Sequence, residues 1–114
     1  MIAVIFEVRP AEGHRDAYLG LAAKLREDLM KMDGFISVER FQSLTDPERM
    51  LSLSFWRDEA AVAAWRNHER HRATQAAGRG GVFAEYRLRV AAVLRDYGME
   101  DRAEAPHDSR EQHG

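Results

Sequence analysis

The sequence contains no cysteine, and it has no long apolar run. The missing cysteines exclude disulfide bonds, thiolate nucleophiles, iron–sulfur clusters and zinc sites built on cysteine. The apolar stretch that starts at Ile2 ends at Phe6, because Glu7 and Arg9 follow. This stretch is too short for a signal-peptide core or a membrane span. We therefore expect a cytoplasmic protein with no membrane contact.

The sequence also lacks an excess of charge of one sign. It contains 17 Lys and Arg residues and 19 Asp and Glu residues, which gives a formal net charge of -2. Charges of both signs are mixed along the chain, which argues against nucleic acid or an anionic membrane as a partner. No Gly-rich loop has the pattern of a dinucleotide or phosphate site, so a nucleotide cofactor is not indicated.

The chain of 114 residues is 45% hydrophobic, so we expect one compact domain. Residue periodicity predicts strands at 2–9, 35–43, 50–57 and 85–96, and helices at 12–32 and 60–77. This order is typical of an α+β, ferredoxin-like fold, in which two helices cover one face of a four-stranded antiparallel sheet. The domain is expected over residues 1–98. Residues 99–114 are polar, without aromatic or β-branched side chains, and are predicted to be a disordered tail.

The predicted strands carry large apolar residues in both alternating sets. In the third strand, for example, Leu51 and Leu53 alternate with Met50 and Trp56. A sheet face that is open to water would be more polar than this. We therefore expect the sheet face without helices to pack on a second copy of the chain, giving a homodimer.

The second predicted helix carries the most unusual side chains. Trp65 and His68 are three residues apart, so they should be neighbours on one side of the helix, and His71 lies further round. Trp65 could be a core residue or the wall of a ligand cavity. His68 and His71 could be exposed helix residues or could transfer protons. The His-x-x-His spacing lacks a third ligand, so no metal site is expected.

Three further candidates lie on the predicted strands. Glu7 could act as a base in a cleft, or it could be exposed or paired with a strand arginine such as Arg89. Phe6 and Phe55 are large aromatic residues that could line a site for a small apolar ligand.

Several short motifs resemble the antibiotic biosynthesis monooxygenase family, and the resemblance covers about residues 1–98. The motifs are Phe55-Trp56-x-Asp58-Glu59-Ala60, Ala64-Trp65-Arg66-x-His68-x-x-His71, Gln75-x-x-Gly78-Arg79 and Tyr86-x-x-Arg89-Val90. The resemblance implies a ferredoxin-like fold that assembles as a dimeric α+β barrel.

The resemblance also implies an activity. Family members of one kind oxidise small aromatic, phenolic or quinol substrates with dioxygen and without a cofactor. Trp65 would then line the cleft, His68 and His71 would carry the proton, and Tyr86 and Arg79 would stabilise negative charge. Two alternatives remain open. The chain could be a non-catalytic barrel that binds a small apolar molecule, or it could be a haem-degrading oxygenase.

The haem-degrading alternative is disfavoured by the residues themselves. That branch of the family has an Asn on the first strand, a Trp on the second helix, and a haem-binding His three turns further along. The corresponding residues here are Glu7, Trp65 and Gln75. Only the Trp is kept, although His71 could still bind haem in a shifted register.

Overall fold

The computed structural model describes residues 1–75 and 81–113, with the backbone alone for 70–75 and 113. The elements in chain order are β1 (Ile2–Pro10), α1 (Arg15–Leu29), β2 (Phe35–Gln42), β3 (Met50–Trp56), α2 (Glu59–Gln75), β4 (Phe83–Ala92) and α3 (His107–His113). The four predicted strands and both predicted helices are therefore confirmed. The end of the second helix, predicted near residue 77, lies outside the described residues.

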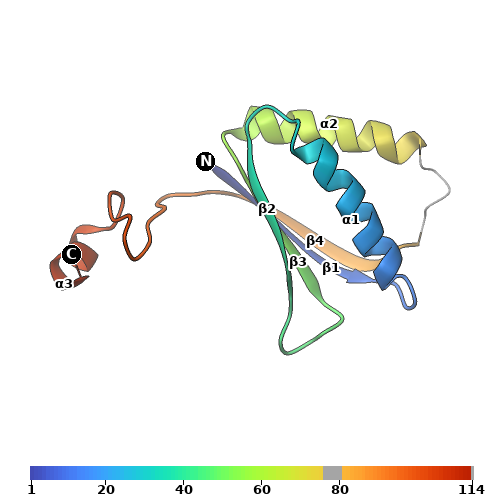
Figure 1. Cartoon of the computed structure of the whole chain (residues 1–114), viewed down its shortest axis with the longest axis horizontal. Coiled ribbons are helices and arrows are strands. Elements are labelled where there is room, and N and C mark those ends of the chain that lie inside the picture. Colours follow the sequence, from blue (N-terminus) through green and yellow to red (C-terminus); the bar gives the residue numbers. More distant parts are fainter. Residues whose placement is uncertain (76–80, 114) are drawn as a thin grey trace.

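The strands form one sheet in the order β2-β3-β1-β4. Every neighbouring pair is antiparallel, and α1 and α2 lie together on one side of the sheet (Figure 1). This arrangement confirms the predicted ferredoxin-like α+β fold. Because β1 and β3 occupy the centre, β2 and β4 are the two edges of the sheet.

The core lies between the sheet and the two helices, in two clusters. One cluster surrounds Trp56, which is 1% exposed, and includes Leu29 of α1 and Val62 of α2. The other contains Val8, Tyr18 and Met50. The even-numbered residues of β1 therefore face the helices, and by the register so do those of β3 and β4.

The junction between α1, β2 and α2 is fixed by local backbone chemistry. Gly34 has a φ of +84°, which other residues rarely adopt, and its carbonyl accepts a hydrogen bond of 2.8 Å from the Arg57 amide. The carboxylate of Asp58 accepts a hydrogen bond of 2.9 Å from the Ala61 amide, as expected for a helix N-cap. These contacts fix the start of α2 beside the end of β3.

The end of the last strand differs from the prediction. Apolar alternation continues to Leu94, but β4 ends at Ala92, and Leu94 is 84% exposed. The reason is the length of the neighbouring strand, since Ala92 is paired with Ile2 at the beginning of β1. One further backbone hydrogen bond continues the pairing, from the Val93 amide to the Met1 carbonyl at 3.0 Å.

The segment after the sheet points away from the domain (Figure 1). It contains the short helix α3, which the sequence analysis did not predict. Arg102 connects two parts of this segment. Its guanidinium carbon lies 5.2 Å from the Tyr97 ring centroid, and one guanidinium nitrogen donates a hydrogen bond of 2.6 Å to the Ser109 hydroxyl. The disorder of residues 99–114 stays a prediction.

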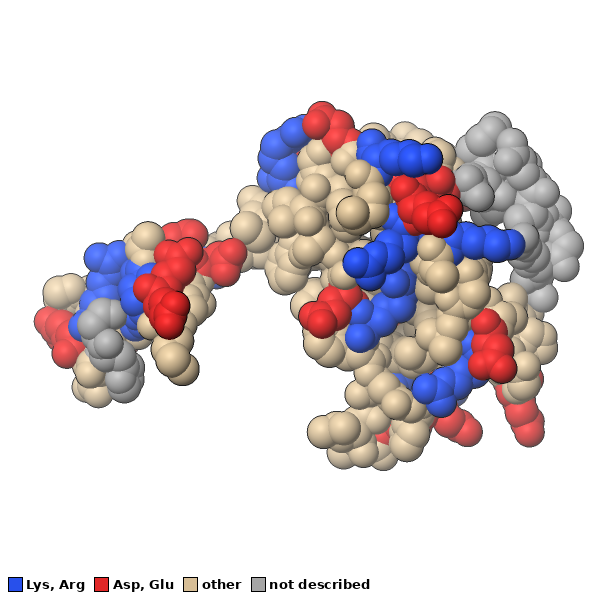
Figure 2. Space-filling model, in the orientation of Figure 1, with Lys and Arg blue, Asp and Glu red and all other residues tan. Residues whose placement is uncertain are grey.

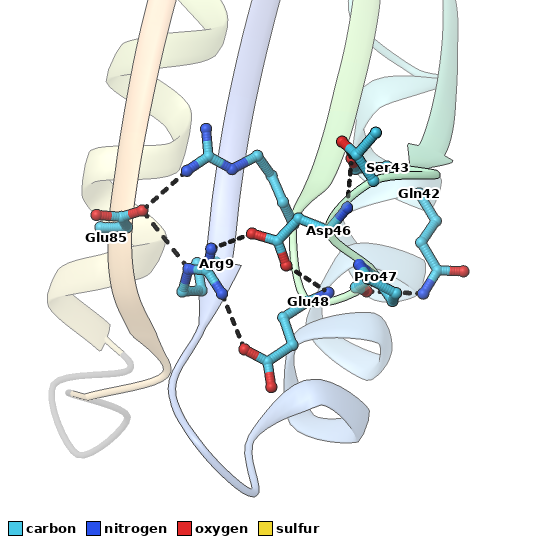
Figure 3. A network of polar contacts seen from close by, with 9 residues as sticks. Arg9, Gln42, Ser43, Asp46, Pro47, Glu48 and Glu85 are labelled. Carbon is cyan, nitrogen blue, oxygen red and sulfur yellow. Dashed lines mark hydrogen bonds and ion pairs between the residues drawn. The ribbon is translucent and has the colours of Figure 1, made fainter.

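The sheet face without helices carries apolar and charged side chains, and a network of ion pairs lies at one end of it. Arg9 joins the carboxylates of Asp46, Glu48 and Glu85, and Arg49 also contacts Glu85 at 3.3 Å (Figure 3). These ion pairs connect β1 with the β2–β3 loop and with β4. They hold the loop and both strands together at this end of the sheet.

The surface chemistry agrees with the mixed charge of the sequence. Basic and acidic side chains are interspersed over the face shown in Figure 2. Within the described residues, no helix combines the length and apolar character that crossing a bilayer requires.

Candidate active site

The edge strand β4 leaves an apolar strip uncovered on the side that faces the helices. Tyr86, Leu88 and Val90 belong to this side, because their partners Val8, Phe6 and Val4 pack into the core. Their exposed fractions are nevertheless 64%, 52% and 46%. The helices therefore cover β1 but leave a row of apolar side chains open on β4, beside the core.

Four aromatic rings gather at the beginning of this strip. The Phe6 ring centroid lies 5.9 Å from that of Phe83 and 5.6 Å from that of Tyr86. Tyr18 of α1 contacts Phe83 at 5.8 Å. Next to these rings is a cavity of about 500 Å³, lined by Leu21 and residues 81–86. The pocket is open to solvent, and Phe83 and Tyr86 give it an aromatic wall.

Helix α2 supplies a second group of rings above the sheet. The imidazole of His68 stacks on Trp65, with centroids 5.5 Å apart and planes inclined by 28°. Trp65 in turn lies 6.2 Å from the buried Trp56. The predicted neighbourhood of Trp65 and His68 is thus confirmed, and the stack fixes the orientation of the imidazole.

Asp28 of α1 faces this imidazole. Its Oδ2 lies 3.8 Å from Nε2 of His68, and both atoms are buried. The sequence analysis did not identify Asp28, although the residue interrupts the apolar stripe that also contains Leu25 and Leu29. At 3.8 Å the carboxylate lies beyond hydrogen-bond distance of this nitrogen and makes an electrostatic contact with the ring edge.

Glu7 and Phe55 lie on the opposite side of the sheet. Both belong to the odd-numbered set of their strands, and Glu7 forms an ion pair of 3.2 Å with Arg89. Glu7 therefore lies on the other side of the sheet from the helices that carry His68 and Asp28. The ion pair with Arg89 is the alternative that the sequence analysis named.

Two other residues predicted for the site have no described side chain. Arg79 lies outside the described residues, and His71 is described by its backbone alone. Among the predicted ligand-binding residues, the structure brings Phe6 and Tyr86 together, while Trp65 packs in the separate cluster around Trp56. The roles of all these residues stay predictions.

A second polar pair lies beneath α1. Arg40 of β2 faces the helices, donates a hydrogen bond of 3.5 Å to the Ala22 carbonyl of α1 and lies close to Tyr18. Burial raises the pKa of Tyr18 above its usual value, and the neighbouring guanidinium acts in the opposite direction. Neither residue was identified from the sequence, because an arginine in a strand pattern does not reveal which face it occupies.

The described residues contain no group of three or more His, Cys, Asp or Glu side chains that could hold a metal ion. The rings of Phe6, Phe83 and Tyr86 adjoin the cavity, whereas the stack of Trp65 and His68 packs against the other core cluster, around Trp56.

Comparison with known proteins gives the family. The family model described as antibiotic biosynthesis monooxygenase matches residues 1–77. The chain therefore belongs to the antibiotic biosynthesis monooxygenase family, as the sequence motifs indicated.

One relative carries a specific name, "Jasmonate monooxygenase ABM" from Pyricularia oryzae. It is 48% identical over 93 residues, which cover 82% of this chain and 43% of the relative. This chain thus spans less than half the length of that protein.

Solved structures of low sequence identity share the fold. Rv0793 from Mycobacterium tuberculosis has a TM-score of 0.72 at 20% identity, covering 85% of this chain and 98% of its own. PA3566 from Pseudomonas aeruginosa has a TM-score of 0.69 at 20% identity, covering 82% and 93%. At this identity the similarity establishes the fold alone.

Proposed function

We propose that the chain is a monooxygenase domain that binds a small apolar substrate in the helix-side cleft and oxidises it with dioxygen. The observation that carries this proposal is the uncovered strip of Tyr86, Leu88 and Val90 beside the aromatic cavity. A monomeric domain rarely leaves such a strip open without a ligand or partner for it. Family membership and the name of the Pyricularia oryzae relative support an oxygenase as the class of activity.

The finer proposal is a cofactor-independent oxidation of an aromatic, phenolic or quinol substrate. His68, oriented by Asp28 and Trp65, removes the phenolic proton. The resulting phenolate is rich in electrons and can transfer one to dioxygen. When a ring CH2 is oxidised to a carbonyl, one atom of O2 enters the product and the other leaves as water with the two hydrogens. The substrate supplies all four electrons, so no external reductant enters.

The name of the Pyricularia oryzae relative suggests jasmonate as a second substrate to test. Insertion of one oxygen atom into a C–H bond, giving an alcohol and water, needs two electrons that the substrate does not supply. A reductant such as a reduced nicotinamide would then be required. Dependence on a reductant therefore separates the two kinds of substrate.

Oxygen uptake by the purified protein tests the proposal. The substrates are a set of hydroquinones and anthrones without reductant, and jasmonate with and without NADPH, with haem titration as a control. We expect one substrate to be consumed together with an equal amount of dioxygen, at a rate that falls in His68→Gln. Binding without any oxygen uptake would instead favour the non-catalytic alternative, a barrel that stores or carries an apolar molecule.

We also propose a homodimer that forms through the sheet face without helices. Ile5, Leu51, Leu53 and Phe55 occupy this face, and Phe41 at its border is 42% exposed. A second copy covers these side chains, each contributing about 1.5–3 kcal/mol before ordering costs. Sedimentation analysis tests the assembly, and a monomer at micromolar concentration would contradict it. A cytoplasmic location stays a prediction from the sequence.

A further inference from the structure

The sheet face without helices has a cross-strand row with opposite charges at its two ends. The register pairs Leu53 of β3 with Ile5 of β1, so these two residues form the middle of the row. Leu53 is also paired with Glu39 of β2, and Ile5 is also paired with Arg89 of β4. From one edge of the sheet to the other, the row is therefore acidic, apolar, apolar and basic.

Neighbouring residues show that this row lies on the side without helices. Val38 of β2 and Val4 of β1 pack against the core cluster around Trp56, between the sheet and the helices. Side chains alternate between the two sides of a strand, so the next residues, Glu39 and Ile5, point the other way. The row thus lies on the surface that is proposed for the homodimer.

The two charged ends of the row differ in their partners within the chain. Arg89 forms an ion pair of 3.2 Å with Glu7, and its side chain is still 51% exposed. A guanidinium has five N–H donors, so one carboxylate leaves some of them available. Glu39 is exposed, and no basic side chain in the described part of the chain lies within ion-pair distance of it. Within the described residues, the row therefore ends in an unpaired carboxylate on β2 and a partly used guanidinium on β4.

The order of charges along this row distinguishes two ways of pairing the sheets. Two identical sheets that pack face to face are related by a two-fold axis parallel to their planes. If the axis runs along the strands, each row lies over the same row of the partner in the opposite order. Glu39 then faces the partner's Arg89, and Leu53 faces the partner's Ile5. If the axis instead runs across the strands, along this row, Glu39 faces the partner's Glu39, and like charges opposed at an interface weaken association.

Both charged ends lie close enough to the middle of the row to meet across the interface. Neighbouring strands are about 4.8 Å apart, so each end lies about 7 Å from the middle. Packed sheets are about 10 Å apart, a gap that an arginine and a glutamate directed toward each other can span. A relative rotation of about 30° between the sheets shifts the ends by about 4 Å, which the long arginine side chain can follow.

The row that follows on the same face fits this orientation by shape. Phe55 of β3 is paired with Ala3 of β1, so this row has a large side chain on one side of its middle and a small one on the other. With the axis along the strands, the ring of Phe55 lies over the partner's Ala3. A large residue opposite a small one allows the two faces to interdigitate. Charge and shape therefore favour the same orientation of the second copy.

The row on the other flank is compatible with this orientation. It has Phe41 at one end and Arg87 at the other, with Leu51 and Glu7 between them. The same axis places the ring of Phe41 over the partner's Arg87, where a guanidinium can lie on an aromatic face. Leu51 then lies over the partner's Glu7. The carboxylate of Glu7 has its cation within its own chain, in the ion pair with Arg89.

We propose that the second copy packs on this face with the two-fold axis along the strands, so that Glu39 of each copy forms an ion pair with the partner's Arg89. This inference rests on the proposed function in one respect, that the sheet face without helices forms a homodimer. It adds the orientation of the partner and the residues that specify it. This orientation also brings β2 of the partner next to β4, the strand that borders the cavity.

Cross-linking between single cysteines tests the orientation directly, because the chain has no cysteine of its own. Glu39→Cys and Arg89→Cys are prepared as separate full-length proteins, mixed to exchange subunits, and treated with a short bismaleimide. We expect a covalent dimer from the mixture and none from either variant alone. Covalent dimers from each variant alone, with none added by mixing, would place the axis across the strands and overturn the proposal.

Charge reversal provides the second measurement. Glu39→Arg should raise the dissociation constant of the dimer about tenfold, because it opposes two arginines in both symmetric contacts. Glu27→Arg makes the same change of charge on the exposed side of α1 and should leave the constant unchanged. Sedimentation equilibrium measures the constants, and circular dichroism verifies that each variant is folded.

The outcomes separate this inference from the homodimer on which it rests. A dimer that is equally stable in Glu39→Arg and in the unchanged protein, or one without the mixed cross-link, would overturn the orientation and leave the homodimer standing. A monomer in the unchanged protein would remove both.

Discussion

His68 on α2 and Asp28 on α1 face each other across the helix layer, with 3.8 Å between Nε2 and Oδ2. Trp65 stacks on the other side of the imidazole at 5.5 Å. The ring is therefore held between a carboxylate and an indole contributed by two helices. If His68 is the base proposed above, this placement readies it for proton transfer without further ordering.

We predict that His68→Gln lowers substrate turnover by a factor of about 10²–10⁴, the usual contribution of a general base. Asp28→Asn should have a smaller effect, about tenfold, because it leaves the imidazole in place but removes the charge that orients it. Oxygen uptake measures both rates. His107→Gln in the exposed helix α3 is the control and should behave as the unchanged protein. Equal rates in all three variants would remove His68 from the site.

We predict that Leu88→Glu weakens ligand binding at least tenfold, because a carboxylate in the open strip must be desolvated when an apolar ligand covers it. Arg87→Glu places the same side chain on the opposite face of β4 and should not change the affinity. Calorimetric titration with a bound substrate compares the two. A similar loss in both variants would place the ligand elsewhere.

We predict that Leu53→Asp converts the proposed dimer into a folded monomer. The change replaces an apolar side chain of a central strand by a charged one on the face without helices, where it would be buried against the second copy. Leu19→Asp on the exposed side of α1 is the control. Analytical ultracentrifugation gives the mass of each variant, and circular dichroism verifies the fold. A dimer that persists in Leu53→Asp would exclude this face.

We predict that the protein loses stability when the pH falls below about 4. The hydrogen bond from Arg9 lowers the pKa of Asp46, and the hydrogen bond from the Ala61 amide lowers the pKa of Asp58. A lowered folded-state pKa stabilises the fold above the unfolded-state pKa, and this stability is lost as the pH falls through the folded-state value.

Thermal unfolding between pH 7 and pH 3 measures this acid sensitivity. Asp58→Asn keeps a good helix cap but cannot ionise, so its unfolding temperature should depend less on pH. An unchanged pH dependence in Asp58→Asn would show that this carboxylate does not contribute.

We predict that Gly34→Ala destabilises the fold more than Gly13→Ala. Both glycines have positive φ, at +84° and +76°, so alanine is strained at each by about 1–2 kcal/mol. At Gly34 the added Cβ would also lie 2.6 Å from Cβ of Ala61, whereas at Gly13 nothing lies within 4 Å. Overpacking should add about 1–3 kcal/mol at Gly34. Urea unfolding measures the difference, and equal losses would contradict this account.

The sequence determined the elements and the fold, because both depend on local patterns. Alternating and helical spacing locate four strands and two helices, and Asp58 marks the start of the second helix. The spacing of Trp65 and His68 also predicts their contact, since a helix places residues three apart on one side. Motifs within these same elements identified the family.

Only the tertiary structure decided which residues share the cleft. The alternation of β1 does not reveal which face the helices cover, so Glu7 and Phe6 were equal candidates until the packing separated them. Asp28 and Arg40 gained their partners from other elements, and the end of β4 was set by the length of β1. The physical reason is that a side chain's neighbours across a sheet or between helices depend on how the elements pack, and no local spacing contains that information.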